Sequence, residues 1–287
     1  MSSKDNHKHL PKPSWLKSKL PDAFEYNRMK DLLSKKHLHT ICESGSCPNM
    51  GECWSAGTAT FMILGDICTR SCRFCNVKTG KPNAPDELEP LKIAEAVIQM
   101  KLKHVVLTSV DRDDLPDYGA EHWKKTISII KIVSPETTIE ALIPDMQGSV
   151  IDLETIISAD PEIISHNLET VRRLTKEVRV FANYDTSLEV IDFLSSSGVT
   201  TKSGIMLGLG ETDDEVYKTM DDLKKADCEI LTLGQYLQPS YKHLPVERYV
   251  EPEQFEHFKK IALKKGFKYV ESAPLVRSSY RAERHIK

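Results

Sequence analysis

The chain has 287 residues, enough to bury most of its apolar surface without covalent cross-links, which excludes a disulfide-stapled miniprotein. Its composition, 40% hydrophobic and 28% charged, is globular, and it has no run of the roughly 18 apolar residues that would span a bilayer. The formal net charge of −3 gives no electrostatic case for nucleic acid. We therefore expect a globular protein that binds neither nucleic acid nor membranes.

The first ten residues are polar and lack the apolar core of a secretory signal, so a cytoplasmic protein is expected. Thiols stay reduced in the cytoplasm. The seven cysteines of the chain therefore favour metal ligation or catalysis over disulfides. Six of them form two groups. The first is Cys42-x4-Cys47-x5-Cys53, on a stretch whose prolines and glycines let the backbone curl around an inorganic centre.

The second group, Cys68-x3-Cys72-x2-Cys75, follows an apolar run over 60–65 that predicts a buried strand. The group would then lie on a loop at the C-terminal end of a strand, where β/α barrels place their active sites. Structural zinc commonly takes paired cysteine hooks, which neither group offers, and a cubane iron–sulfur cluster prefers four thiolates. Each triad therefore predicts a metal site whose last position is open or filled from a distant segment. The isolated Cys228 is interpreted as a small buried hydrophobe.

Apolar, β-branched runs alternate with helical patterns through the middle of the chain. Strands are predicted near 59–65, 104–109, 137–143, 162–166, 201–207 and 229–234, and helices near 91–102, 119–133, 149–158, 187–197 and 213–226. Val178–Ala182 is interpreted as a loop or an added strand. This order predicts an α/β fold with a parallel sheet. Six units are two fewer than a closed eight-stranded barrel needs, so we expect a partial (β/α)6 TIM-type barrel.

Segments outside this repeat suggest three parts: an N-terminal extension over 1–57 with the first triad, the barrel over 58–240, and a C-terminal extension over 241–287. The extensions are expected to cover an open edge and the mouth. In the last part a helix is predicted over Glu251–Lys265, and Phe267 and Tyr269 as the core of a strand.

Several polar or glycine positions follow predicted strands and become candidate site residues. Asn167 and Glu169 would face a barrel mouth, with surface loop positions as the alternative. The stretch Gly204–Glu211 matches neither a dinucleotide fingerprint nor a P-loop, and a tight strand-to-helix turn is its alternative role. His166 is interpreted as a structural histidine. Arg277 either holds an anionic group or forms a surface salt bridge.

Cys68-x3-Cys72-x2-Cys75, with Phe74 before its last cysteine, resembles the cluster motif of the radical S-adenosylmethionine (SAM) enzymes. In that superfamily three thiolates hold a [4Fe–4S] cluster, and the fourth iron binds the amine and carboxylate of SAM. Active sites of this kind lie at the mouth of a partial barrel, so the resemblance implies the same fold as the strand and helix pattern.

Three further stretches are similar to the lipoyl synthases within that superfamily. They are Cys42-Glu-Ser-Gly-Ser-Cys47-Pro-Asn-Met-Gly-Glu-Cys53-Trp54, Ala59-Thr-Phe-Met-Ile-Leu-Gly-Asp66 and Pro274-Leu-Val-Arg-Ser-Ser-Tyr280. The similarity extends over nearly the whole chain. It implies a sulfurtransferase of lipoate biosynthesis that inserts two sulfur atoms at C6 and C8 of an octanoyl chain on a lysine of a lipoyl carrier domain.

The resemblance also implies cofactors, partners and site residues. Two [4Fe–4S] clusters and SAM are expected, with Ser278 as a further ligand of the first triad. The implied partners are an octanoylated lipoyl carrier protein, an electron donor such as ferredoxin or flavodoxin, and an iron–sulfur cluster carrier. Thr108 and Ser109 stand where many superfamily members have Gly-Gly-Glu. The implied SAM contacts are Thr108, Ser109, Asn167, Glu169, Gly204 and Gly208.

Two other functions remain open at this point. A different sulfur-inserting radical SAM enzyme, similar to biotin synthase, would use the same triads and would differ in its product. A zinc-binding module would complete two tetrahedra with Cys228 and histidines, although such modules are usually much smaller than this chain.

Overall fold

The computed structural model describes residues 10–17, 23–44, 47, 49–55 and 58–285. Within them, eight strands form one sheet in the order β1-β2-β5-β6-β7-β8-β9-β10. Their bounds are β1 His39–Thr40, β2 Thr58–Ile63, β5 His104–Ser109, β6 Thr138–Leu142, β7 Ile163–Ser165, β8 Thr201–Leu207, β9 Ile230–Gln235 and β10 Tyr269–Ser272. Strand β1 is antiparallel to β2, and every other neighbouring pair in this sheet is parallel.

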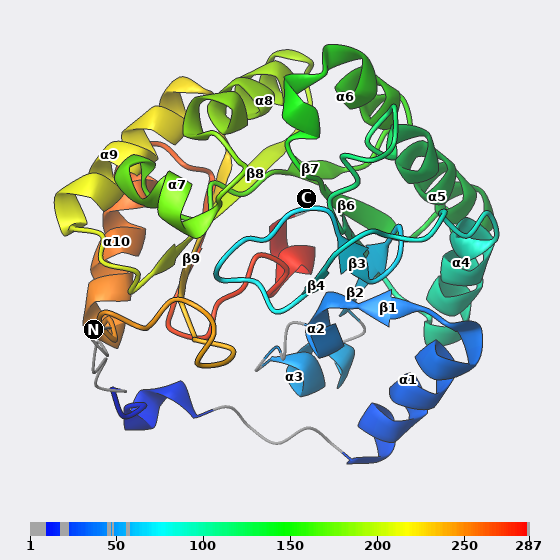
Figure 1. The fold of residues 1–287 in the computed structure, drawn as a ribbon, viewed down its shortest axis with the longest axis horizontal. Helices are drawn as coiled ribbons and strands as arrows, with labels where there is room; N and C mark the ends of the chain where they lie inside the picture. Colours follow the sequence, from blue (N-terminus) through cyan, green and yellow to red (C-terminus); the bar gives the residue numbers. More distant parts are fainter. Residues whose placement is uncertain (1–9, 18–22, 45–46, 48, 56–57, 286–287) are drawn as a thin grey trace, which may run out of the picture.

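Helices cover the outside of this curved sheet in chain order (Figure 1). They are α4 Glu89–Met100, α5 Ala120–Val133, α6 Val150–Ile157, α8 Tyr184–Ser196, α9 Asp213–Lys225 and α10 Pro252–Lys264. The predicted α/β fold, a partial TIM-type barrel, is confirmed, and β2 and β5 to β9 correspond to the six predicted strands. The difference is β10, a seventh parallel strand next to β9, at the place where Tyr269 was predicted as strand core.

Shorter elements complete the described chain. They are η1 Ser14–Leu16, α1 Ala23–Lys36, α2 Ile41–Ser44, α3 Met50–Ser55, β3 Ile67–Cys68, β4 Lys78–Thr79, η2 Met146–Gly148, η3 Arg172–Leu174, α7 Thr175–Val178 and η4 Ala282–His285. Val178 ends α7 and a turn follows, so the stretch Val178–Ala182 adds no strand. Within the described residues, no helix has the length and apolarity needed to cross a membrane.

Local sequence signals explain where these elements begin and why the strands are buried. Thr212 caps α9 with a complete capping box, in which its side chain and that of Glu215 bind each other's backbone N–H. Val105, Val106 and Leu107 in the middle of β5 are fully buried, as expected for a parallel strand covered on both faces. The alternation of buried strands and capped helices therefore forms the barrel wall.

The C-terminal segment occupies the inside of the barrel. Figure 1 shows η4 in the middle of the ring of strands. His285 in η4 is buried and lies near Lys202 and Glu140, an ion pair inside the barrel with Nζ and Oε2 2.8 Å apart. Thr58, at the start of β2, donates to Glu283 at 3.4 Å. The segment thus extends to the N-terminal ends of the strands and closes that end of the barrel.

Candidate active site

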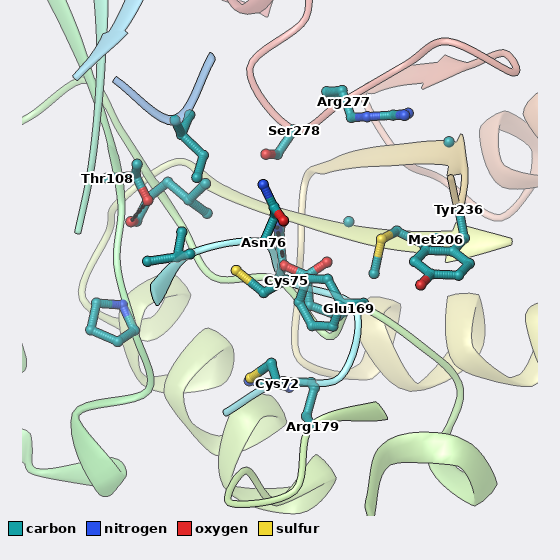
Figure 2. Close-up of a pocket in the computed structure, with 18 of the residues that line it drawn as sticks. Cys72, Cys75, Asn76, Thr108, Glu169, Arg179, Met206, Tyr236, Arg277 and Ser278 are labelled. Carbon is teal, nitrogen blue, oxygen red and sulfur yellow. Dashed lines mark hydrogen bonds between the residues drawn. The ribbon is translucent and has the colours of Figure 1, made fainter. Parts of the chain in front are cut away.

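A cavity of about 480 Å³ lies at the C-terminal ends of the strands (Figure 2). Its walls come from β5, β8 and β9, from the loops after β6 and β7, from the Cys68–Thr79 loop and from the C-terminal segment near Ser278. This is the position that parallel β/α barrels give to their active sites. Its size is in the range of small-molecule sites.

The cavity brings together most of the residues that the sequence indicated. Its lining includes Cys68, Cys72, Cys75, Thr108, Ser109, Asn167, Glu169, Gly204 and Ser278. The first triad and Gly208 do not contribute to the lining. Gly208 lies in the turn after β8 with φ +99°, and its N–H donates to Glu211 at 2.7 Å. Its position fits the alternative role, a strand-to-helix turn that needs a glycine.

The loop of the second triad begins and ends in the small β3–β4 sheet, where Cys68 pairs with Thr79. The Cys68 Sγ accepts backbone N–H groups from Arg70 at 3.4 Å and Asp111 at 3.3 Å. Burial raises the pKa of Cys68 and Cys72 to about 12, so both are neutral thiols unless a metal deprotonates them. Thiols on one cavity wall, one of them supported by two N–H donors, fit an iron–sulfur cluster.

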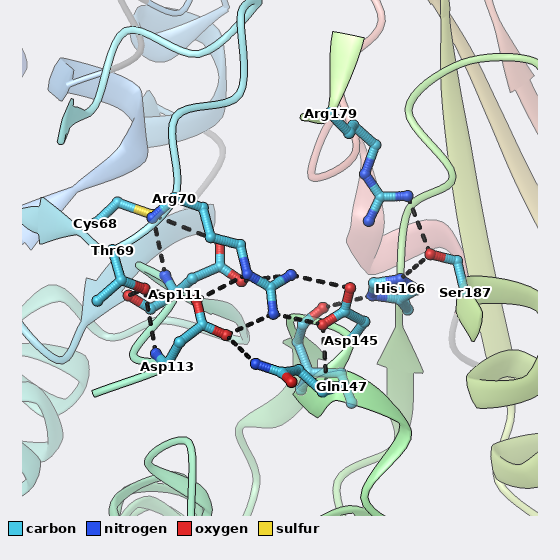
Figure 3. A network of polar contacts seen from close by, with 11 residues as sticks. Cys68, Thr69, Arg70, Asp111, Asp113, Asp145, Gln147, His166, Arg179 and Ser187 are labelled. Carbon is cyan, nitrogen blue, oxygen red and sulfur yellow. Dashed lines mark hydrogen bonds and ion pairs between the residues drawn. The ribbon is translucent and has the colours of Figure 1, made fainter. Parts of the chain in front are cut away.

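Arg70 anchors this loop from within the motif (Figure 3). It donates to both carboxylate oxygens of Asp113, at 2.8 and 2.7 Å, and to Asp145 at 2.9 Å, and it lies 3.4 Å from Asp111. Gln147 adds a bond to Asp113 at 2.9 Å. Since the guanidinium is only 7% exposed, these charge-assisted bonds fix the loop firmly. Sequence reasoning missed this network because its members are far apart in the chain.

Ser109, Asn167 and Glu169 add polar side chains to the lining of the cavity. Asn167 Nδ2 donates to Glu169 at 3.0 Å, while Asn167 Oδ1 and Ser109 Oγ are buried without a hydrogen-bond partner in the structure. Burial raises the pKa of Glu169, and the charge of Arg179 opposes that effect. A Cβ on Gly204 would lie 3.1 Å from Asn167 Oδ1, so glycine keeps this wall open. These groups fit a polar ligand such as SAM.

In the first triad, Cys42 lies in α2, Cys53 lies in α3, and Cys47 lies between these two helices. Burial, together with the nearby Cys47 thiol, raises the pKa of Cys42 and Cys53 to about 12. Among the described residues, no three His, Cys, Asp or Glu side chains are placed to hold one metal ion. A cluster does not need such convergence, because each thiolate binds a different iron. The mutual proximity of these thiols fits a second cluster.

Side chains connect the two triads and the C-terminal segment. Asn76, which follows Cys75, donates to the Ser44 carbonyl at 2.9 Å. Arg277 lines the cavity and is close enough to Cys47 to lower the pKa of that thiol, which burial raises. In the described part of the chain Arg277 forms no ion pair with a carboxylate, so the surface salt bridge is not formed. His166 uses both ring nitrogens, on the Ile143 carbonyl and the Ser187 hydroxyl, as a structural histidine does.

Comparison with known proteins gives the class of this site. The family model of the radical SAM superfamily matches residues 62–223, more than half of the chain. Solved structures of methylornithine synthase (15% identity, TM-score 0.53, covering 85% of this chain and 81% of that one) and of HydG, a maturase of the [FeFe]-hydrogenase (13%, 0.58, 92% and 64%), have the same fold. The chain is a radical SAM enzyme.

Closer relatives narrow this class. Residues 1–47 match the N-terminal domain of lipoyl synthase of the radical SAM family. Lipoyl synthase of Bacteroides fragilis is 59% identical over 282 residues, 98% of each chain, and mitochondrial lipoyl synthase of Nematostella vectensis is 57% identical over 96% of this chain and 95% of its own. The chain therefore belongs to the lipoyl synthase family, whose members are sulfurtransferases that use SAM and iron–sulfur chemistry. Membership of this family excludes the two alternative functions, a zinc-binding module and an enzyme similar to biotin synthase.

Replacing Gly234 by alanine is expected to disturb the wall that carries Ser278. A Cβ on Gly234 would lie 2.1 Å from the Val276 carbonyl oxygen, so the C-terminal segment must move. Overpacking of this kind costs about 1–3 kcal/mol. We expect a lower midpoint of unfolding and loss of lipoyl product. Gly80→Ala is the matched control, since its nearest side-chain atom is 3.5 Å away; equal behaviour of the two variants would contradict the prediction.

Proposed function

We propose that this chain inserts two sulfur atoms at C6 and C8 of an octanoyl chain carried by a lysine of a lipoyl carrier domain. The observation that carries the proposal is the arrangement of two cysteine triads around one cavity. Cys68, Cys72 and Cys75 line the cavity, and Asn49, between two cysteines of the first triad, binds the segment whose Ser278 lines the same cavity. Family membership supports the same reaction.

Removing hydrogen from unactivated methylene carbons is beyond any side-chain base, so cofactors must carry that step. Cys68, Cys72 and Cys75 would hold a [4Fe–4S] cluster, which would supply the electron for reductive cleavage of SAM and so give access to radical chemistry. The chain provides the anchored loop for that cluster. Asn167, with its unpartnered Oδ1, and the adjacent Glu169 hold polar groups of SAM in our proposal.

The rest of the cavity suits a fatty acyl chain. Met62, Leu142, Ile205 and Met206 are apolar members of its lining. An enclosed apolar site keeps water and protein side chains away from a primary carbon radical. We place the octanoyl chain along these apolar residues, with its reacting carbons between the SAM groups and the first triad.

The second cluster would be held by Cys42, Cys47 and Cys53 with Ser278 as its further ligand, and it would supply the sulfur. Ser278 lies in the cavity wall, and its neighbour Arg277 is close to Cys47, which supports this ligand set. An octanoylated carrier protein is the substrate of this reaction. We propose in addition an external electron donor, ferredoxin or flavodoxin, and a carrier that rebuilds the consumed cluster.

Ser278→Ala tests this ligand. We expect SAM cleavage to continue while lipoyl product disappears, because only the first triad loses a ligand. The measurement is anaerobic turnover with mass spectrometry of 5′-deoxyadenosine and of the carrier. Ser279→Ala is the matched control and should form product. Full product formation by Ser278→Ala would refute the ligand set.

A further inference from the structure

The C-terminal segment is tied to the first triad by side chains from both sides. We call these contacts the clasp; its members are Asn49, Glu52 and Thr58 on one side and Leu275, Tyr280, Arg281 and Glu283 on the other. None of these residues is one of the proposed cluster ligands, although most of them fall in the stretches that resemble the lipoyl synthases. Their placement around the triad points to a function of their own.

The Asn49 and Thr58 contacts of the clasp are partly buried, whereas the Tyr280–Glu52 contact is exposed. Asn49, 5% exposed, donates from Nδ2 to the Leu275 carbonyl at 2.5 Å. Tyr280 donates its hydroxyl proton to Glu52 Oε1 at 3.0 Å, and Arg281 lies 3.7 Å from the same oxygen. An exposed ion pair contributes little by itself, whereas a buried carbonyl without a donor is costly. We therefore expect the Asn49 bond to stabilise the clasp more than the exposed contacts of Glu52 do.

The clasp joins two segments of the chain that both carry proposed ligands of the first triad's cluster. Asn49 and Glu52 lie between Cys47 and Cys53, whereas Leu275 and Tyr280 lie on either side of Ser278 in sequence. The paired residues are 226 and 228 positions apart. The barrel already fixes β10 before this segment and η4 after it, so the clasp restrains only the stretch between them that carries Ser278. A dissociated Ser278 on a restrained stretch stays at high effective concentration near the first triad.

We propose that Asn49, Glu52 and Tyr280 are positioning residues that hold Ser278 beside the first triad. The serine can then leave and rejoin the cluster while the C-terminal segment stays attached. This inference rests on the proposed function, in which Ser278 is a ligand. Gly234 supports the segment from the other side, because the Val276 carbonyl packs where a Cβ would be.

The test uses the reconstituted holoenzyme with Tyr280→Phe and Asn49→Leu. The first variant removes only a hydroxyl, and the second keeps the branched shape and the number of heavy atoms and removes the amide. Two quantities are measured: hydrogen–deuterium exchange of the peptide over 275–285, and the rate at which a chelator removes iron. Tyr249→Phe is the matched control, since its hydroxyl donates to the Leu10 carbonyl at 3.4 Å, outside the clasp.

In both clasp variants we expect the backbone amides of residues 275–285 to exchange about fivefold faster, which corresponds to the loss of a single net hydrogen bond. About half of the iron should leave faster as well, while the cluster of the second triad stays. Exchange and iron release equal to those of Tyr249→Phe in both variants would overturn the clasp. If Asn49→Leu does not fold, Tyr280→Phe decides alone.

Ser278→Ala in the same assays separates the clasp from the proposed function. Unchanged iron release in Ser278→Ala, with fast exchange in Tyr280→Phe, would overturn the serine ligand and leave the clasp supported. Fast iron release in Ser278→Ala, with unchanged exchange in both clasp variants, would overturn the clasp and leave the ligand supported.

Discussion

Replacing Lys202 by methionine is expected to lower the free energy of unfolding by about 3–5 kcal/mol, because it leaves the Glu140 carboxylate buried without its cationic partner. Both side chains are fully buried inside the barrel, with Nζ 2.8 Å from Oε2, and Ser165 donates to the other carboxylate oxygen at 2.8 Å. Denaturant unfolding under anaerobic conditions measures the effect. A Lys202→Met variant as stable as the wild-type protein would contradict it.

Two further variants separate the lost pair from a general effect of the substitution. Lys202→Met combined with Glu140→Leu removes both charges and should recover most of the loss, because no unpaired charge remains. Lys268→Met breaks an exposed pair with Glu229 and should change stability by less than about 1 kcal/mol.

Replacing Cys68, Cys72 and Cys75 together by alanine is expected to abolish SAM cleavage and to remove about half of the bound iron, since one of the two clusters that we propose loses its thiolates. The first triad and its contacts are untouched by this change. Iron and sulfide analysis with an ultraviolet–visible spectrum of the anaerobic protein measures the loss. Cys228→Ala is the control, because this buried thiol lies outside both triads and should keep all the iron. Stoichiometric zinc, or undiminished iron in the triple variant, would contradict the prediction.

The barrel could be predicted because its signals are local. The apolar β5 run and the acidic start of α9 after Thr212 each depend on a few consecutive residues. The position of the second triad followed from the strand before it. Strand β10 was not counted as a barrel unit, because only four residues at the edge of the sheet form it.

The remainder of the site depends on contacts between distant residues. Arg70 meets carboxylates 43 and 75 positions away, and Asn49 meets a carbonyl 226 positions away, so no local pattern contains them. Gly204 and Gly208 look alike in the sequence, yet Gly204 alone lines the cavity. The path of the backbone at the end of β8 decides which glycine lines the cavity, and this path cannot be predicted from the local sequence.

We propose that the cluster of the first triad supplies the sulfur that reaches the product. Cys228 is fully buried, and burial raises its pKa to about 12, so it is unsuited to carry sulfur as a reactive thiolate. The direct test is a reaction with protein reconstituted with isotopically labelled sulfide, without a cluster carrier, followed by mass spectrometry of the carrier. Each chain should make no more than a single lipoyl group, and both inserted sulfurs should carry the label. Sustained turnover under these conditions, or unlabelled product from labelled protein, would contradict the account.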